Sequence, residues 1–196
     1  MTNYALNVRN DNYEQAHDEN GDEGHKRSLG AILQILKKEG CDTDKLMDQI
    51  KDLIVKTIII GQPNLHHLYR ILQPECLDNS MAFQILGFDV LIDADYKPYL
   101  LEVNCSPSFG TDSPLDYRIK KSVIMDAFAL LNFSKKKRKE IIKQKKEKNE
   151  FRMRTGKTIK LSAEEREKLK QEKLAERFQH EASNMAGYEL IYPSGD

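Results

Sequence analysis

Three oxygen-bearing side chains lie in two neighbouring apolar runs of the sequence. Asp89 belongs to MAFQILGFDVLID (81–93), and Glu102 and Asn104 belong to YLLEVN (99–104). Carboxylate and amide oxygens are the ligands that Mg²⁺ takes from proteins, usually beside phosphate oxygens. These residue types therefore predict a divalent-cation site, provided that the fold brings the three side chains together.

An antiparallel hairpin would bring them together. Both runs are apolar and rich in β-prone residues, and residues 94–97 form a short polar connection between them. A four-residue connection sets a register in which Asp89 lies opposite Glu102 and Gly87 lies opposite Asn104. Because side chains alternate along a strand, the two carboxylates and the amide then project from one face. Carboxylates at cross-strand distance repel each other unless a cation or a proton offsets the repulsion.

The register is the step on which this prediction depends. It pairs Asp93 with Pro98, and a slip by one residue would send Asp89 to the opposite face. The alternative is a solvated hairpin face whose carboxylates never meet a metal. Gly87 leaves space opposite Asn104, which a ligand could use.

Helices are expected over most of the remaining chain. Apolar side chains recur at helical spacing, and Ser162 with Glu165 has the pattern of a capping box. We expect Gly61 and Pro63 to end the second helix. The predicted helices cover about 26–38, from 42–44 to about 60, 115–133, 135–154 and 163–183.

Composition excludes several classes of protein. The 196 residues, of which 39% are hydrophobic, could bury one core of ordinary size. Three cysteines at unrelated spacings indicate neither a disulfide framework nor a zinc site. No apolar run reaches the length of a membrane span, and the first residues do not resemble a signal peptide. We therefore expect a cytoplasmic protein without a membrane partner.

The charge distribution is uneven although the net charge is zero. Residues 135–160 carry 13 Lys or Arg and three acidic residues, whereas residues 1–134 carry 13 basic and 20 acidic residues. Such a block suits an acidic partner. A solvated helix and a nuclear-localisation-like run are the alternatives, and no nucleic-acid partner is expected because the block lacks interleaved stacking residues. The basic side chains that we assign to this block include Lys135, Lys136, Lys137, Arg138, Lys139, Lys143, Lys145 and Lys146.

Four segments together resemble the tubulin tyrosine ligase-like family, and its polyglutamylase branch in particular. FQILGFDVLIDADYKPYLLEVNCSPSFGTDSPLD is similar to the family's GFD strand followed by LLEVN-x-SPS. MTNYALN is similar to its LTNY-x-N segment, and GHKRSL to its G-S-K-R-x-L segment. GYELIYP is similar to a motif that follows the basic helices of the polyglutamylases.

The resemblance implies an α+β chain, with the C-terminal part of an ATP-grasp domain in residues 1–113. A helical, basic, microtubule-binding-like region would follow in 114–196. Polar loop residues and a solvated lysine remain the plain alternative for Tyr4 and Lys26, and Cys105 could equally be an inert small residue. The implied roles are Mg²⁺ binding by Asp89, Glu102 and Asn104, ATP binding by Thr2 and Asn3, and amino-acid binding by Tyr4, Lys26 and Cys105.

The implied reaction is ATP-dependent and Mg²⁺-dependent ligation of free L-glutamate to glutamate side chains of tubulin tails through an acyl phosphate. A non-catalytic microtubule-binding remnant and a tubulin glycylase are the alternatives. We expect a monomer that meets microtubules in the cytoplasm, with cilia or flagella as one location. Because the family's nucleotide-gripping lysines lie largely upstream of LTNY, we expect little ligase activity from the isolated chain.

Overall fold

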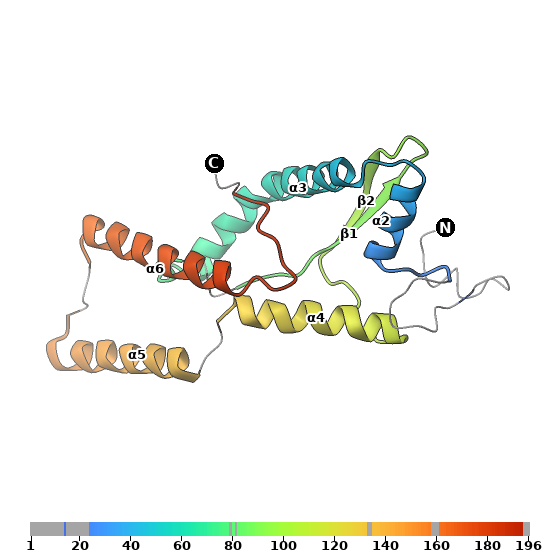
Figure 1. The fold of residues 1–196 in the computed structure, drawn as a ribbon. Helices are drawn as coiled ribbons and strands as arrows, with labels where there is room; N and C mark the ends of the chain where they lie inside the picture. Colours follow the sequence, from blue (N-terminus) through green and yellow to red (C-terminus); the bar gives the residue numbers. More distant parts are fainter. Residues whose placement is uncertain are drawn as a thin grey trace. The chain divides into compact units, whose positions relative to one another are not determined.

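The computed structural model describes residues 14, 24–78, 80, 82–132, 135–157 and 161–193. This part of the chain forms five helices and one two-stranded antiparallel sheet (Figure 1). The α+β class predicted from the sequence is confirmed. None of the helices in these ranges combines the length and the apolar character that crossing a membrane requires.

Helix α2, Leu29–Lys38, begins three residues later than predicted because Ser28 is its cap. The Ser28 side chain accepts a hydrogen bond from the backbone N–H of Ala31 at 3.1 Å. A serine in this position satisfies one of the donors left open at a helix start. Gly40 follows the helix with a φ of +96°, a conformation that glycine adopts without strain.

Helix α3, Thr43–Leu72, does not end where the sequence predicted. It continues through Gly61 and Pro63, so the prediction of a stop at these residues is wrong. An internal proline removes one backbone hydrogen bond and is disfavoured rather than forbidden. Apolar residues continue at helical spacing beyond Pro63, and the backbone N–H of Gln73 still bonds to the carbonyl of Tyr69.

Strand β1, Gly87–Ile92, pairs with strand β2, Pro98–Asn104. Ile92 rather than Asp93 lies opposite Pro98, so the predicted pairing at the turn is wrong, and the connection has five residues, 93–97.

Asp93 is drawn into the turn because its side chain caps it. Asp93 Oδ1 accepts hydrogen bonds from the backbone N–H groups of Asp95 and Lys97, both at 2.9 Å. Tyr96 completes the turn with a φ of +60°.

Three further helices follow the hairpin: α4, Pro114–Leu130; α5, Lys135–Thr155; and α6, Ala163–Ser183. Their positions agree with the predicted ranges to within three residues at each end. Ser162 and Glu165 form the predicted capping box, with bonds of 3.1 and 2.8 Å in the two directions.

The chain divides into two compact units that alternate along the sequence. The first contains 1–64, 84–122 and 190–196, and the second contains 65–83 and 123–189. Few side chains are buried in either unit among the described residues, and Leu46 is the largest that is almost fully enclosed. The division into domains at residues 113 and 114 remains a prediction.

Candidate functional site

The hairpin register at the site end agrees with the sequence prediction. Asp89 pairs with Glu102, and Gly87 pairs with Asn104. The longer turn shifts the pairing of the strands by one residue, and a β-bulge shifts it back. Val90 pairs with Leu100, so Leu101 is an extra residue of β2. The additional residue in the turn and the additional residue in β2 compensate each other, which restores the predicted pairing.

The three predicted metal ligands converge through the amide of Asn104. Its Nδ2 donates to Asp89 Oδ2 at 3.3 Å and to Glu102 Oε1 at 3.1 Å. Partial burial raises the pKa of Asp89, and the neighbouring carboxyl of Glu102 raises it further, whereas the Asn104 amide opposes the shift. The net effect is a raised pKa of Asp89, as expected for a carboxyl group that is partly removed from water and lies beside a second acid.

The donor set fits a hard cation. Neither Asp89 nor Glu102 forms an ion pair with a Lys or Arg of the described residues. Those residues also contain no group of three or more His, Cys, Asp and Glu side chains arranged for a metal, so a site here needs the amide as its third ligand. An Asn104 side chain that presents Oδ1 instead of Nδ2 would complete an all-oxygen set.

The space beside Gly87 is not open to a ligand, contrary to the sequence expectation. A Cβ atom on Gly87 would lie 3.2 Å from Pro107 Cβ and 3.5 Å from Asn104 Cβ. The absence of a side chain on Gly87 therefore allows the segment after β2 to pack closely on β1. This contact fixes the loop beside the end of the strand that carries Asn104.

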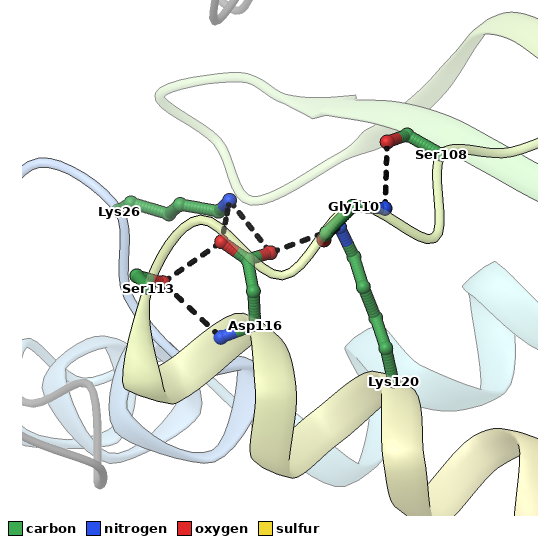
Figure 2. Close-up of polar contacts among 6 residues, drawn as sticks. All are labelled: Lys26, Ser108, Gly110, Ser113, Asp116 and Lys120. Atoms are coloured by element: carbon green, nitrogen blue, oxygen red, sulfur yellow. Dashed lines mark hydrogen bonds and ion pairs between the residues drawn. The ribbon is translucent and has the colours of Figure 1, made fainter.

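Lys26 is anchored to a buried carboxylate at the start of α4 (Figure 2). Its Nζ lies 2.8 Å from Asp116 Oδ1 and 2.7 Å from Asp116 Oδ2. Ser113 Oγ donates to Asp116 Oδ2 at 2.8 Å and accepts from the Asp116 backbone N–H at 3.1 Å. Lys120 Nζ lies 3.1 Å from Asp116 Oδ1 and also donates to the carbonyl of Gly110.

Asp116 is ionised in this arrangement. Burial by itself raises the pKa of Asp116, but the hydrogen bonds from Lys26, Ser113 and Lys120 outweigh it, so the pKa lies below its ordinary value. This cluster was not predicted from the sequence. The sequence does contain Ser-x-x-Asp before an apolar helix, which is a pattern typical of a helix start. The contact with Lys26 could not be predicted from it, because Lys26 is distant in the sequence.

The other residues predicted to bind substrates are only partly described. Thr2, Asn3 and Tyr4 lie outside the described residues. The Cys105 side chain is exposed, and its backbone carbonyl accepts a hydrogen bond from Gln84 Nε2 at 2.9 Å. The roles assigned to these four residues remain predictions.

Helix α5 contains residues 135–155 of the basic block, and the described basic side chains of this helix are exposed. Lys143 and Lys146 approach Glu147 and Glu150 at 3.8 Å, and these contacts are too long and too exposed to stabilise the helix much. The side chains of Lys136 and Lys137 are outside the described part of the helix. The remaining predicted members of the block are Lys135, Arg138, Lys139, Lys143, Lys145 and Lys146, and all of them lie on α5.

Known proteins resemble the chain over its whole length. It is 46% identical over 199 aligned positions to a probable beta-tubulin polyglutamylase of Tetrahymena thermophila, of which it covers 16%. It is 36% identical to tubulin polyglutamylase TTLL7 of Mus musculus and 37% identical to tubulin polyglutamylase ttll6 of Danio rerio. The alignments take in 100% and 98% of this chain respectively, and 24% of each relative. The chain thus spans about a sixth to a quarter of the length of these relatives.

The family assignment rests on a match that extends beyond the β1–β2 hairpin. Residues 1–141 match the Tubulin-tyrosine ligase family. This range includes the hairpin, Lys26 and its partner Asp116, and helix α4. The chain therefore belongs to the tubulin-tyrosine ligase family.

Proposed function

We propose that the protein to which this chain belongs ligates L-glutamate to glutamate side chains in the C-terminal tails of tubulin, with ATP and Mg²⁺. The observation that carries the proposal is the convergence of Asp89, Glu102 and Asn104 at one end of a hairpin. Relatives that are named tubulin polyglutamylases, and that align with the whole chain, supply the substrate class.

The proposed reaction balances without a nucleophile from the protein. A γ-carboxylate of the tubulin tail attacks the γ-phosphate of ATP, which breaks the bond to ADP and gives an acyl phosphate. The α-amine of free glutamate then attacks the acyl carbon, loses a proton and expels inorganic phosphate. Every reacting partner is anionic, so the protein must supply positive charge and alignment.

The residues of this chain have separate parts in that task. Asp89, Glu102 and Asn104 would hold Mg²⁺, which neutralises phosphate charge when it is bound. Lys26, together with the predicted Tyr4 and Cys105, would contact the incoming amino acid, and Thr2 and Asn3 would approach the ATP phosphates. Helix α5 would bind the acidic surface of a microtubule. We further propose that the protein acts as a monomer on cytoplasmic microtubules, including those of cilia or flagella.

The test is a ligation assay on the product of the complete reading frame that contains this chain. Tubulin, ATP, Mg²⁺ and labelled glutamate are incubated together, and mass spectrometry of the tubulin tails follows the added residues. Glu102→Gln should abolish ligation while microtubule co-sedimentation remains close to that of the unmodified protein. Ligation by Glu102→Gln at the unmodified rate would contradict the metal assignment. Labelled glycine in place of glutamate tests for a glycylase, and binding without any ligation would indicate a non-catalytic protein.

A further inference from the structure

Asp116 is the most enclosed charged group in the described part of the first unit. Its side chain is 6% exposed, yet two ammonium groups and one hydroxyl reach its two oxygens (Figure 2). Removing a carboxylate from water is costly unless hydrogen bonds replace the solvent. The contacts from Lys26, Lys120 and Ser113 meet that need, so Asp116 is a fixed negative charge at the start of α4.

The positive charges around Asp116 exceed its own charge. Lys26 and Lys120 together carry two positive charges, and the N-terminal end of α4 adds the positive end of the helix dipole. The Lys26 side chain is 40% exposed, whereas the side chain of its partner Asp116 is 6% exposed. In the proposed function, a carboxylate of the amino-acid substrate approaches Lys26 from its exposed part.

We propose that Asp116 is a positioning residue that holds the Lys26 ammonium in place for a carboxylate of the amino-acid substrate. This inference rests on the proposed function, in which Lys26 contacts that amino acid. Asp116 does not itself touch substrate. Lysine has a flexible stem, and an ammonium already held in one orientation loses less freedom when a ligand binds.

The loop between β2 and α4 gives the anchor a second connection to the site. Lys120 donates to the carbonyl of Gly110, and the backbone N–H of Gly110 donates to Ser108 Oγ at 3.3 Å. This loop follows Asn104 directly, and Pro107 within it packs against Gly87. The segment that follows the predicted metal ligand Asn104 therefore also supports Asp116, through Ser113 and through the contact of Gly110 with Lys120.

The alternative is that the ion pair only ties residue 26 to α4 and stabilises the fold. The two possibilities differ in which kinetic constant they change. A positioning role affects the substrate that Lys26 contacts, whereas a loss of local structure affects every substrate of the site. The experiment therefore measures KM for glutamate and for ATP separately, in the product of the complete reading frame.

Three variants form a cycle: Asp116→Asn, Lys26→Met and the double variant. We expect Asp116→Asn to raise KM for glutamate about ten-fold and to leave KM for ATP within about two-fold of its original value. Lys26→Met should raise KM for glutamate by at least as much. The double variant should be no worse than Lys26→Met, because Asp116 has nothing left to position. Calorimetric titration with glutamate gives a second readout that does not require turnover.

The outcomes separate this inference from the proposed function. If Lys26→Met weakens glutamate binding and Asp116→Asn does not, the positioning role is wrong and the proposed function stands. If Asp116→Asn raises both KM values together, or adds its effect to that of Lys26→Met, the ion pair is structural. If the unmodified protein neither ligates nor binds glutamate, both proposals are wrong.

Two further variants test whether an effect of Asp116→Asn arises only because the variant protein fails to fold. Asp52→Asn removes the carboxylate from the exposed Lys56–Asp52 pair on α3, a pair of 2.6 Å, and should leave both KM values unchanged. If Asp116→Asn does not fold, Ser113→Ala removes one contact to Asp116 and keeps its charge. A two- to three-fold rise in KM for glutamate alone would support the inference, and equal rises for glutamate and ATP would overturn it.

Discussion

Asp89 and Glu102 face each other directly across the two strands of the hairpin, and Asn104 donates a hydrogen bond to each of them. Two carboxylates in this relationship destabilise a ladder that contains nothing else to offset their charge. We therefore expect the Asp89–Glu102 pair to lower the stability of the hairpin when no cation is bound and a bound cation to offset this loss. Each effect can be measured separately.

Replacement of Asp89 by asparagine should stabilise the chain in the absence of divalent ions at neutral pH. The variant no longer places like charges opposite each other, and the gain should lie at the lower end of about 0.2–1 kcal/mol because the site is exposed. The free energy of unfolding, measured in urea with a chelator, checks the sign. Asp95→Asn, which removes an acid from the turn of the same hairpin, is the control and should not show this gain.

The same comparison should depend on pH in a defined direction. The pKa of Asp89 is raised in the folded chain above its ordinary value of 3.8, so the folded state holds the proton more tightly than the unfolded state. Its contribution to stability is fully present below 3.8 and is lost as pH rises through the raised pKa. The advantage of Asp89→Asn should therefore vanish in acid and grow toward neutral pH. An advantage that is constant with pH would show that charge repulsion is not its cause.

Magnesium should reverse the order of stability. A ligand that binds only the folded state at 100 times its dissociation constant stabilises it by about 2.7 kcal/mol. We expect Mg²⁺ to raise the melting temperature of the unmodified chain and to leave Asp89→Asn and Glu102→Gln nearly unchanged. A scan of melting temperature against Mg²⁺ concentration checks this. Asp95→Asn should respond like the unmodified chain, and an equal response from all four proteins would indicate weak surface binding.

The pairing of the β1–β2 hairpin was predictable because it depends on local pattern. Residue types, alternation and a short connection fix which side chains share a face, and the pairing of Asp89 with Glu102 followed from them. The turn was predicted one residue too short because the side chain of Asp93 accepts two backbone hydrogen bonds, and strand periodicity does not encode this. The pairing nevertheless agreed because the extra Leu101 compensates for the longer turn.

Other features depend on partners that are distant in the sequence. The helix-start pattern at Ser113 is visible locally, but the contact from Lys26 spans 90 residues. Pro63 was expected to end α3 because proline disfavours a helix interior. The apolar residues that recur at helical spacing after Pro63 were not taken as evidence that the helix continues. Such features can be identified only from the structure, because tertiary contacts decide which local alternative forms.

Replacement of Gly87 by alanine should disturb the loop that carries Pro107. The added Cβ would lie 3.2 Å from Pro107 Cβ, so the loop must move by a few tenths of an ångström. Overpacking of this kind costs about 1–3 kcal/mol where neighbours cannot adjust, and the proline ring has little freedom. Urea unfolding measures the loss. Gly30→Ala on α2 is the matched control, because a Cβ there meets no atom within 4 Å, and it should be neutral or stabilising.

The substitution Pro107→Gly identifies the contact responsible, because glycine lacks the Cβ atom that the new alanine would meet. If the clash with Pro107 causes the loss, Gly87→Ala should cost less stability in a Pro107→Gly background than in the unmodified chain. An equal cost in both backgrounds would instead place the strain at Asn104, whose Cβ lies 3.5 Å from the same position.

Charge reversal on α5 should weaken binding to microtubules without affecting the β1–β2 hairpin. Lys145→Glu with Lys146→Glu changes the charge of the helix by four units, and attraction between exposed charges is screened within about 10 Å at 0.1 M salt. We expect the unmodified chain to co-sediment with microtubules at low salt and to be released by about 150 mM added salt. The variant should be released at a lower salt concentration.

The control variant, Lys168→Glu with Lys170→Glu, makes the same change in net charge on α6. Retention of this control close to that of the unmodified chain would assign the binding to α5. Equal losses from both pairs would indicate a response to net charge alone, and binding that persists at high salt would contradict an electrostatic contact.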